Sequence, residues 1–435
     1  MKRMRTAILL VTALSLCGCM TQEKPPPEST PTPEPVRQAV WAAEPPPPYG
    51  MGNEPGVIAA GGYTVREQIK RRGEDGKLHD DYTLYAALAD GIYKGEEEGG
   101  FVRICEDNAS CLNLWEGRLY YINTFEKEGK LCEEIVSVST EGKDRKVHAG
   151  ALPVEGMQIT EDQFPYGVNC TLKNGYTDLH LGENVLYYIA DRDLNGMGGG
   201  IHISTEESSA RWLRYESVHA LCALDLATGV SIVMDDDLGN GAGRMILGDG
   251  SGGYGFMRYT EVYDDGKGAQ QTIIKQLDRV GDENAEKSPE VFMISSGEIA
   301  GLTGKSYFVG RGLEGEDTLR IEYLFTDETD PPWENMPDIA QPLITEQDIY
   351  WLSGEKTGDG WENVMLMRSK QDGSKMRHDP VAEIGAVTAE SEFSRFSLSE
   401  HGKIYLRTEN VLYAVQNPEG KELKAIVKLI DTNLD

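Results

Sequence analysis

One local pattern recurs between residue 84 and the C-terminus and limits the folds that this chain can adopt. A polar turn is followed by an aliphatic–aromatic run, a charged loop, an alternating strand and a tight turn that contains glycine. The five clearest runs are LYYIN (119–123), LYYIAD (186–191), SYFVG (306–310), IYWLS (349–353) and IYLRT (404–408). Weaker copies begin near Gly91 and Tyr254. Short β-type runs separated by Gly, Asn and Asp are typical of an all-β domain.

Each copy can form a small antiparallel sheet with one apolar face, which it cannot bury alone. Stacking such sheets around an axis covers the faces and leaves only short outer edges. The sequence therefore predicts an all-β fold, a β-propeller of about seven blades over residues 84–435, with six or eight as alternatives. The copy near Ile92 precedes Leu119 by only 27 residues, so it either stands alone or completes the last blade. A pair of β-sandwiches is the competing interpretation.

Smaller elements are predicted from glycine placement. The turns STEGKD (139–144), LATGVS (226–231), KQDGSK (370–375) and NPEGKE (417–422) are hairpin signals, because glycine tolerates positive φ. Residues 63–88 are predicted to form one short helix, broken by Gly73 and Gly76.

The five runs and their following strands resemble the YWTD-type β-propeller blades of the low-density lipoprotein receptor family. They are more similar to bacterial lipoprotein domains of unknown function that are built on the same blade. The resemblance covers most of residues 84–430 and implies a propeller, but it implies no particular activity.

The N-terminus has the features of a secretory signal. A basic start is followed by the apolar run TAILLVTALSL (6–16), which is shorter than a membrane-spanning helix needs to be. The run ends in LCGC (16–19), which resembles the lipobox of bacterial lipoproteins. By that resemblance residues 1–18 are a signal peptide and Cys19 carries the lipid, on the extracytoplasmic face of a bacterial cell membrane. An uncleaved anchor and a plain secretory signal are the alternatives.

Residues 19–60 are predicted to be a linker, because 11 of the 20 prolines lie between residues 25 and 55. Proline fixes φ and removes a backbone donor, so this stretch favours extended polyproline II. At about 3.1 Å per residue it could hold the body on the order of 100 Å from the lipid. A spacer is one interpretation, and a docking site for a proline-reading domain is the other.

The charge balance excludes one class of partner. The chain has 42 Lys and Arg against 72 Asp and Glu, a net charge of −30. Nucleic-acid binding needs a basic face, so no nucleic-acid partner is expected. The folded body is likewise not expected to dock on anionic lipid. The expected partners are the membrane, through the lipid on Cys19, and a protein, peptide or glycan ligand.

The segment DRDLNG (191–196) matches the first half of a calcium-binding loop. Oxygen atoms of Asp191, Asp193 and Asn195 at this spacing would wrap a hard cation. The second half does not match, because position 12 is His202, where a bidentate Glu belongs. A calcium site and an ordinary acidic loop therefore both stay open, and no other cofactor is indicated.

No motif selects a catalytic group, so the catalytic residues are unknown. The acidic loop at 235–237 lacks the helix and lysine of a phosphate loop. The run GDGSGG (248–253) has Asp where a serine-hydrolase elbow needs Gly. The seven histidines show no zinc-binding spacing, and the many acidic residues offer carboxylate pairs without selecting one.

Two further features give candidate sites. Cys105 and Cys111 flank the segment EDNAS, so a local hairpin disulfide is one expectation and buried free thiols are the other. Trp212 and Trp333 fall in long insertions, where exposed aromatic rings can stack on sugars or anchor a partner. Packing between blades is the alternative for both tryptophans.

These observations favour a lipid-anchored extracytoplasmic β-propeller that acts as a binding module for an unknown ligand. The alternatives are an extracellular enzyme that acts on glycans and a scaffold for an envelope complex. Binding is favoured over catalysis because no catalytic motif appears, and because a propeller fold by itself does not set function. An enzyme would bring carboxylates and a His or Tyr together at the centre of the propeller.

Overall fold

The computed structural model describes much of the chain between residues 62 and 434. The described residues are 62–72, 78–96, 100–154, 158–159, 170–171, 175–182, 185–191, 219–236, 238–239, 245–249, 255–264, 270–280, 290–296, 299–302, 307–311, 318–323, 336–337, 343–344, 348–358, 360–371, 376–388, 395–398, 403–415 and 423–434. Strands dominate these residues, and the short 3₁₀ helix η4 (Thr432–Leu434) follows the last strand. No helix in the described ranges is long and apolar enough to cross a bilayer.

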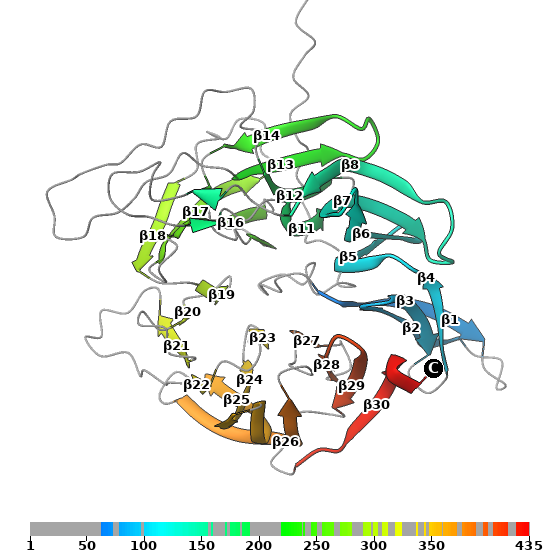
Figure 1. Cartoon of the computed structure of the whole chain (residues 1–435), viewed down its shortest axis with the longest axis vertical. Coiled ribbons are helices and arrows are strands. Elements are labelled where there is room, and N and C mark those ends of the chain that lie inside the picture. The colour runs from blue at the N-terminus through cyan, green and yellow to red at the C-terminus, as the bar shows by residue number, and fades with distance from the viewer. Residues whose placement is uncertain are drawn as a thin grey trace, which may run out of the picture. The chain divides into compact units, whose positions relative to one another are not determined.

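Seven four-stranded antiparallel sheets are present in the described part of the chain, each made of consecutive strands (Figure 1). Sheet 1 contains β1 (Thr64–Arg72), β2 (Leu78–Leu88), β3 (Gly91–Glu96) and β4 (Phe101–Cys105). Sheet 2 contains β5 (Asn108–Trp115), β6 (Arg118–Lys127), β7 (Lys130–Ser139) and β8 (Lys146–Pro153). Sheet 3 contains β11 (Tyr176–Gly182), β12 (Val185–Asp191), β13 (His219–Asp225) and β14 (Ser231–Asp235). A separate pair, β9 (Gln158–Ile159) and β10 (Cys170–Thr171), lies between sheets 2 and 3 in the sequence.

The remaining four sheets repeat this meander. Sheet 4 contains β15 (Met245–Asp249), β16 (Gly255–Asp264), β17 (Gln270–Val280) and β18 (Glu290–Ser296). Sheet 5 contains β19 (Ile299–Leu302), β20 (Tyr307–Arg311), β21 (Thr318–Tyr323) and β22 (Met336–Pro337). Sheet 6 contains β23 (Leu343–Ile344), β24 (Asp348–Thr357), β25 (Gly360–Gln371) and β26 (Met376–Thr388). Sheet 7 contains β27 (Arg395–Leu398), β28 (Ile404–Arg407), β29 (Val411–Val415) and β30 (Ile426–Asp431). The predicted all-β propeller is confirmed, with seven blades in the described residues.

Each of the five clearest aliphatic–aromatic runs forms the second strand of a sheet, and in β6 and β12 both faces of that strand are covered. In β6, Leu119 and Tyr121 belong to the apolar cluster shared with sheet 1, whereas Tyr120 and Ile122 belong to the cluster shared with sheet 3. Strand β12 divides its side chains in the same way between sheets 2 and 4. Successive side chains of a strand point to opposite faces, so an unbroken apolar run marks a strand that is buried on both sides.

In most neighbouring sheets the first strands lie next to each other. Strand β5 contacts β1 and β11, β11 contacts β15, and β23 contacts β19 and β27. Side chains tie these strands together. The Asn113 amide donates to Leu179 O at 3.2 Å and accepts from Leu181 N at 3.2 Å, and the Asp178 carboxylate accepts from Met245 N at 2.8 Å. Neighbouring sheets share no backbone ladder in the described residues. Hydrogen bonds from buried polar side chains to the backbone connect them instead.

The ring closes between sheets 7 and 1 without a shared strand. Strand β29 contacts β2, and Tyr405 and Leu412 pack with Leu84 in one buried cluster. Arg407 Nε donates to Ala87 O at 2.7 Å, and its guanidinium lies 3.7 Å from the centroid of the Tyr63 ring. The segment at Ile92 forms β3 of the first sheet, so it does not complete the last blade.

The helix predicted over residues 63–88 is wrong. The segment forms β1 and β2, paired in register from Thr64 with Ala86 to Arg72 with Leu78, so the first sheet begins before residue 84. The glycines at 73 and 76 lie between these two strands in the sequence, outside the described residues. Both faces of β2 pack against apolar neighbours, with Tyr85 in one cluster and Leu84 in another. This burial on two sides outweighs the weak helical pattern of the sequence.

The predicted turn at 139–144 is confirmed, and so is the turn at 226–231. Gly142 has φ 71°, and the chain also reverses at Glu116 and Gly117, with φ 46° and 71°. Positive φ at both central residues suits the two-residue hairpin that matches strand twist. The predicted turns at 370–375 and 417–422 lie largely outside the described residues.

The outermost strands pair irregularly. Register shifts interrupt the pairing of β4, β8, β14, β18, β26 and β30 with the preceding strand of each sheet. A β-bulge bends and twists an edge strand, which hinders pairing with another chain. Six of the seven sheets in the described residues therefore carry an irregularity that protects their outer edge.

Candidate functional site

Most of the site residues predicted from the sequence lie outside the described residues. These are Cys19, Asp193, Asn195, Trp212 and Trp333. Asp191 is the last residue of β12, and its backbone pairs with His219 at the start of β13. The predicted acidic loop therefore begins where a well-paired strand ends, and calcium binding there stays a prediction.

The two predicted tryptophan sites belong to different kinds of connection. Trp212 falls between β12 and β13, the second and third strands of sheet 3. Trp333 falls between β21 and β22, the third and fourth strands of sheet 5. In an antiparallel meander, successive connections leave the sheet at alternate ends. The chain thus enters these two segments at opposite ends of the respective sheets.

The predicted disulfide between Cys105 and Cys111 is not formed, and both cysteines are thiols. Cys105 ends β4 and packs against the cluster between sheets 1 and 2, with its Sγ 3.6 Å from the Tyr121 hydroxyl. Cys111 has φ 53° in a bulge of β5 and packs in the cluster between sheets 2 and 3. The segment between them links two blades and does not form a hairpin, so the side chains point into different interiors.

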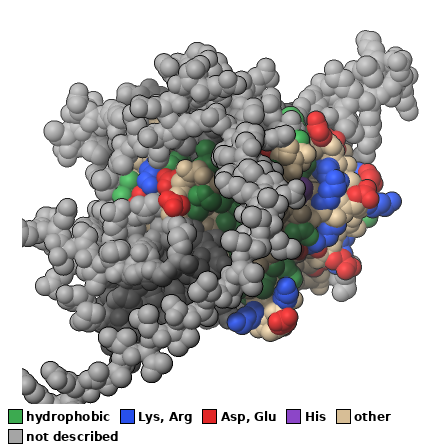
Figure 2. Space-filling model, turned by 90° about the horizontal axis from the view of Figure 1, so that it is seen from above, with side chains coloured by type: hydrophobic (Ala, Val, Ile, Leu, Met, Phe, Trp, Pro, Cys, Tyr) green, Lys and Arg blue, Asp and Glu red, His purple; other side chains and the backbone are tan. Residues whose placement is uncertain are grey.

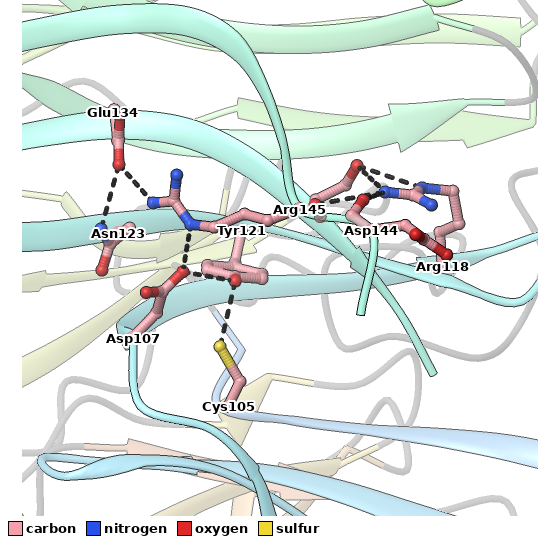
Figure 3. A network of polar contacts seen from close by, with 9 residues as sticks. Cys105, Asp107, Arg118, Tyr121, Asn123, Glu134, Asp144 and Arg145 are labelled. Carbon is pink, nitrogen blue, oxygen red and sulfur yellow. Dashed lines mark hydrogen bonds and ion pairs between the residues drawn. The ribbon is translucent and has the colours of Figure 1, made fainter. Parts of the chain in front are cut away.

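A network of charged and polar side chains lies at the margin of the contact between sheets 1 and 2 (Figure 3). We call it the rim network: Asp107, Tyr121, Asn123, Glu134 and Arg145. Arg145 Nε donates to Asp107 Oδ2 at 2.9 Å, and Arg145 Nη2 donates to Glu134 Oε1. Tyr121 donates its hydroxyl to Asp107 Oδ2 at 2.7 Å, and Asn123 Nδ2 donates to Glu134 Oε1 at 3.2 Å. The residues come from the β4–β5 link, β6, β7 and the β7–β8 turn.

The rim network fixes charge at a partly exposed position. The Arg145 side chain is 37% exposed, Asp107 21% and Glu134 12%. Burial alone would lower the pKa of Arg145, but the hydrogen bonds and charges of Glu134 and Asp107 raise that pKa above its ordinary value. Burial raises the pKa of Tyr121, and the adjacent Asp107 carboxylate raises it further. The guanidinium stays charged and the phenol stays neutral, so the network offers fixed donors and acceptors.

A serine and a histidine lie in contact beside this network. Ser137 Oγ is 2.8 Å from His148 Nε2, the distance expected for a nucleophile and its base. Ser137 is completely buried, however, and Arg118 donates to its Oγ from both Nε and Nη2. Burial lowers the pKa of His148, and Arg118 and Lys146 lower it further. The neutral imidazole suits a hydrogen-bond partner, but no substrate can reach the buried hydroxyl.

A second ionic cluster is buried between sheets 3 and 4. Lys275 Nζ lies 3.0 Å from Asp235 Oδ2 and 2.9 Å from Glu261 Oε2. Tyr259 donates its hydroxyl to Asp235 Oδ2 at 2.7 Å. Burial lowers the pKa of Lys275, but Glu261 and Asp235 reverse this effect and raise it. Its two carboxylate partners keep the Lys275 ammonium charged, and the ion pairs join strands of sheets 3 and 4.

Ionisable groups continue along the same contact between sheets 3 and 4. Asp178 and His180 of β11 are buried, with His180 Nε2 3.4 Å from Asp178 Oδ2. His219 of β13 is also buried, with its Nδ1 3.3 Å from Gly239 O. Within the described ranges, no group of three His, Cys, Asp or Glu side chains is placed to hold a metal ion.

The sequence did not single out the rim network, because its members are spread over four elements. Asp107 and Arg145 are 38 residues apart and meet only because the β7–β8 turn folds back onto sheet 1. A β carbon on Gly142 would lie 1.9 Å from Ile104 O, which shows how closely this turn approaches β4. No local pattern in the sequence reports such a contact between sheets.

Comparison with known proteins finds structural likeness without sequence relatives. No family model matches the chain, and no curated protein matches it. The chain is similar to the β-propeller domain of the trilobed protease from Pyrococcus furiosus, at 10% identity over 87% of this chain and 96% of that one, with a TM-score of 0.40. It is also similar to the Pyrococcus horikoshii acylaminoacyl peptidase, at 13% identity over 91% of this chain and 54% of that one, with a TM-score of 0.40. Likeness this weak carries no inference about activity.

Proposed function

We propose that this chain is a binding module of the bacterial cell envelope, held by a lipid on Cys19 and presenting its propeller to a protein, peptide or glycan ligand. The LCGC segment at 16–19 and the proline-rich residues 19–60 support the anchor and its spacer. The proposal also draws on the resemblance of the repeats to YWTD-type blades and to bacterial lipoprotein domains that are built on the same blade.

The rim network is the observation that carries binding over catalysis. Its Arg145 guanidinium is partly exposed and is oriented by two carboxylates from separate elements. Because these polar groups are already held in place, little free energy is lost in ordering them when a ligand binds. Such preorganisation favours recognition. The side chains that resemble catalytic groups have other contacts in the structure. Ser137 is buried, and Lys275 is paired with two carboxylates.

A panel of glycans and peptides tests recognition by the rim network. A ligand of this surface should bind wild-type protein and lose at least about tenfold in affinity in Arg145→Ala, which is the scale of one charge-assisted hydrogen bond. Arg103→Ala is the matched control, because Arg103 is 43% exposed and pairs with Asp90 and Glu106 outside the network. A ligand that the protein chemically converts, or whose binding ignores Arg145, would overturn the proposal.

The anchor has its own test. When cells that express the full chain are given a labelled fatty acid, the wild-type protein should carry label and the Cys19→Ser variant should not. Cys17→Ser is the control, because Leu16 precedes Cys17 where the lipobox needs a small residue. Label that is lost from Cys17→Ser and kept in Cys19→Ser would contradict the assignment.

A further inference from the structure

One contact in the ring of described sheets differs from the others, because the chain does not cross it. The sheets consist of consecutive strands, so the chain runs on directly from each sheet into the next. It enters the ring at β1 of sheet 1 and ends with β30 and η4 of sheet 7. We call the contact between sheets 7 and 1 the closing contact. Non-covalent contacts hold it, so it can open without stretching a chain link.

The closing contact has an apolar interior with a backbone hydrogen bond beside it. Leu84 of β2 packs in one buried cluster with Leu412 and Ala414 of β29. The Ala89 N–H of sheet 1 donates to Glu409 O of sheet 7 at 3.0 Å. Opening the contact would expose apolar surface to water, so the closed state is favoured and an open state is a minor one.

Gly62 and Tyr63, the first described residues of the chain, connect three sheets, and we call them the strap. Gly62 O accepts from Leu112 N of sheet 2 at 2.8 Å, and Tyr63 O accepts from Ala87 N of sheet 1 at 2.8 Å. The Tyr63 ring centroid lies 3.7 Å from the Arg407 guanidinium of sheet 7. The strap therefore holds sheet 7 to the part of the ring where the chain begins.

Arg407 is the residue through which the strap acts on sheet 7. It is only 7% exposed, and a buried guanidinium is costly unless it has partners. The face of the Tyr63 ring stabilises this cation, and Ala87 O accepts a hydrogen bond from Arg407 Nε at 2.7 Å. Loss of the ring would leave the guanidinium less well compensated, which weakens the hold of sheet 7 on sheet 1.

We propose that the strap gates the ring: the closing contact is shut while Tyr63 covers Arg407, and it opens between sheets 7 and 1 when the strap is displaced. The strap directly follows the proline-rich residues 19–60 in the sequence, so the segment before residue 62 is placed to control the gate. The gate depends neither on the rim network nor on a lipid at Cys19. Its test therefore stands apart from the tests of the proposed function.

Cysteine labelling of the full chain in detergent reports the opening of single contacts. Ala414→Cys places a thiol in the closing contact, and Ala382→Cys places one in the cluster shared by sheets 6 and 7, on the other side of sheet 7. Both alanines are at most 1% exposed, so each new thiol reacts with a small alkylating reagent only when its contact opens. Mass spectrometry of the digested chain measures each new thiol separately from the native cysteines.

Displacement of the strap is mimicked by Tyr63→Leu. This variant should raise the labelling rate at Ala414→Cys by at least about fivefold, the scale of a cation–π contact, and should change the rate at Ala382→Cys by less than about twofold. Tyr63→Phe is the matched variant, because it keeps the ring and should label at the wild-type rate. An equal rise at both reporters would show a general loss of stability and would overturn the gate, as would an unchanged rate at Ala414→Cys.

The role of Arg407 is tested from the side of sheet 7. Arg407→Met should raise labelling at Ala414→Cys at least as much as Tyr63→Leu does, because it also loses the hydrogen bond to Ala87 O. In the Arg407→Met background, Tyr63→Leu should add less than about twofold, since both changes remove the same contact. If the two effects multiply, the strap does not hold sheet 7 through Arg407, and the proposal fails.

Discussion

Two contacts between neighbouring blades solve the same packing problem with different chemistry. Between sheets 1 and 2 the interior is apolar, with Tyr85, Leu112 and Val136 in one buried cluster and the charges at the rim. Between sheets 3 and 4 an apolar cluster is also present, but Asp178, the Lys275 ion pairs and two histidines are buried beside it. We call these contacts seam 1–2 and seam 3–4.

The difference determines how each seam should respond to change. Apolar burial is non-directional and tolerates small shifts, whereas a buried charge is stable only while its partners stay in place. Seam 3–4 should therefore be sensitive to the loss of a single partner, and seam 1–2 should be sensitive mainly to changes in shape. Figure 2 shows acidic and basic side chains interspersed on the described surface, where solvent moderates each pair.

The largest expected effect separates the two seams directly. Lys275→Met should lower the free energy of unfolding by about 3 kcal/mol, because it leaves Asp235 and Glu261 buried without their cation. Arg145→Met at the rim of seam 1–2 should cost less than about 1 kcal/mol, because the Arg145 side chain is already 37% exposed and solvent weakens its ion pairs. Urea unfolding of the full chain, followed by fluorescence, measures both. Equal costs would show that the seams do not differ in this way.

A second prediction concerns alkaline pH and the contact between sheets 2 and 3. Burial raises the pKa of Cys222 from 9.0 to about 11. The folded state holds the thiol proton more tightly than the unfolded state, so stability is full below pH 9 and is lost as pH rises toward 11. The loss attributable to Cys222 should approach about 2 kcal/mol.

Comparing wild type with Cys222→Ala isolates this contribution from the tyrosines that titrate in the same range. The variant should be less stable at pH 8, because the thiol is buried, but its unfolding midpoint should fall less between pH 8 and pH 11. Parallel pH profiles for the two proteins would show that the Cys222 thiol titrates equally in both states.

The seams also show what the sequence could and could not predict. The run LYYI at 119–122 predicted a strand of a repeated small sheet, because a short apolar run between turn residues is a local property of the sequence. That both faces of this strand are covered became clear only from the structure. The Lys275 cluster was not predicted, because Asp235, Glu261 and Lys275 come from β14, β16 and β17 and meet only through packing between sheets. The disulfide prediction failed for a similar reason, since the bulge at Cys111 is set by the fit to sheet 3.

The shape of seam 1–2 is tested at Gly142. Its φ of 71° and its approach to Ile104 O leave no room for a β carbon, so Gly142→Ala should cost about 2 kcal/mol and loosen the β7–β8 turn from β4. Gly117→Ala is the control, because Gly117 has the same φ and nothing within 4 Å of the added carbon. The difference between the two costs reports the close approach alone. Equal costs would mean that the turn moves away freely.

The smallest expected effect lies on the acid side and again involves sheet 2. Burial, together with Arg118 and Lys146, lowers the pKa of His148 below 6.5, so the unfolded chain takes up a proton that the folded chain refuses. The contribution of His148 to stability should therefore be full above about pH 6.5 and should be lost as pH falls below it. His148→Gln should remove this part of the pH dependence while keeping a group that can bond Ser137. If the variant and wild type keep the same stability difference from pH 7.5 to pH 5, then the folded chain does not lower the pKa of His148, and the contact with Ser137 is only structural.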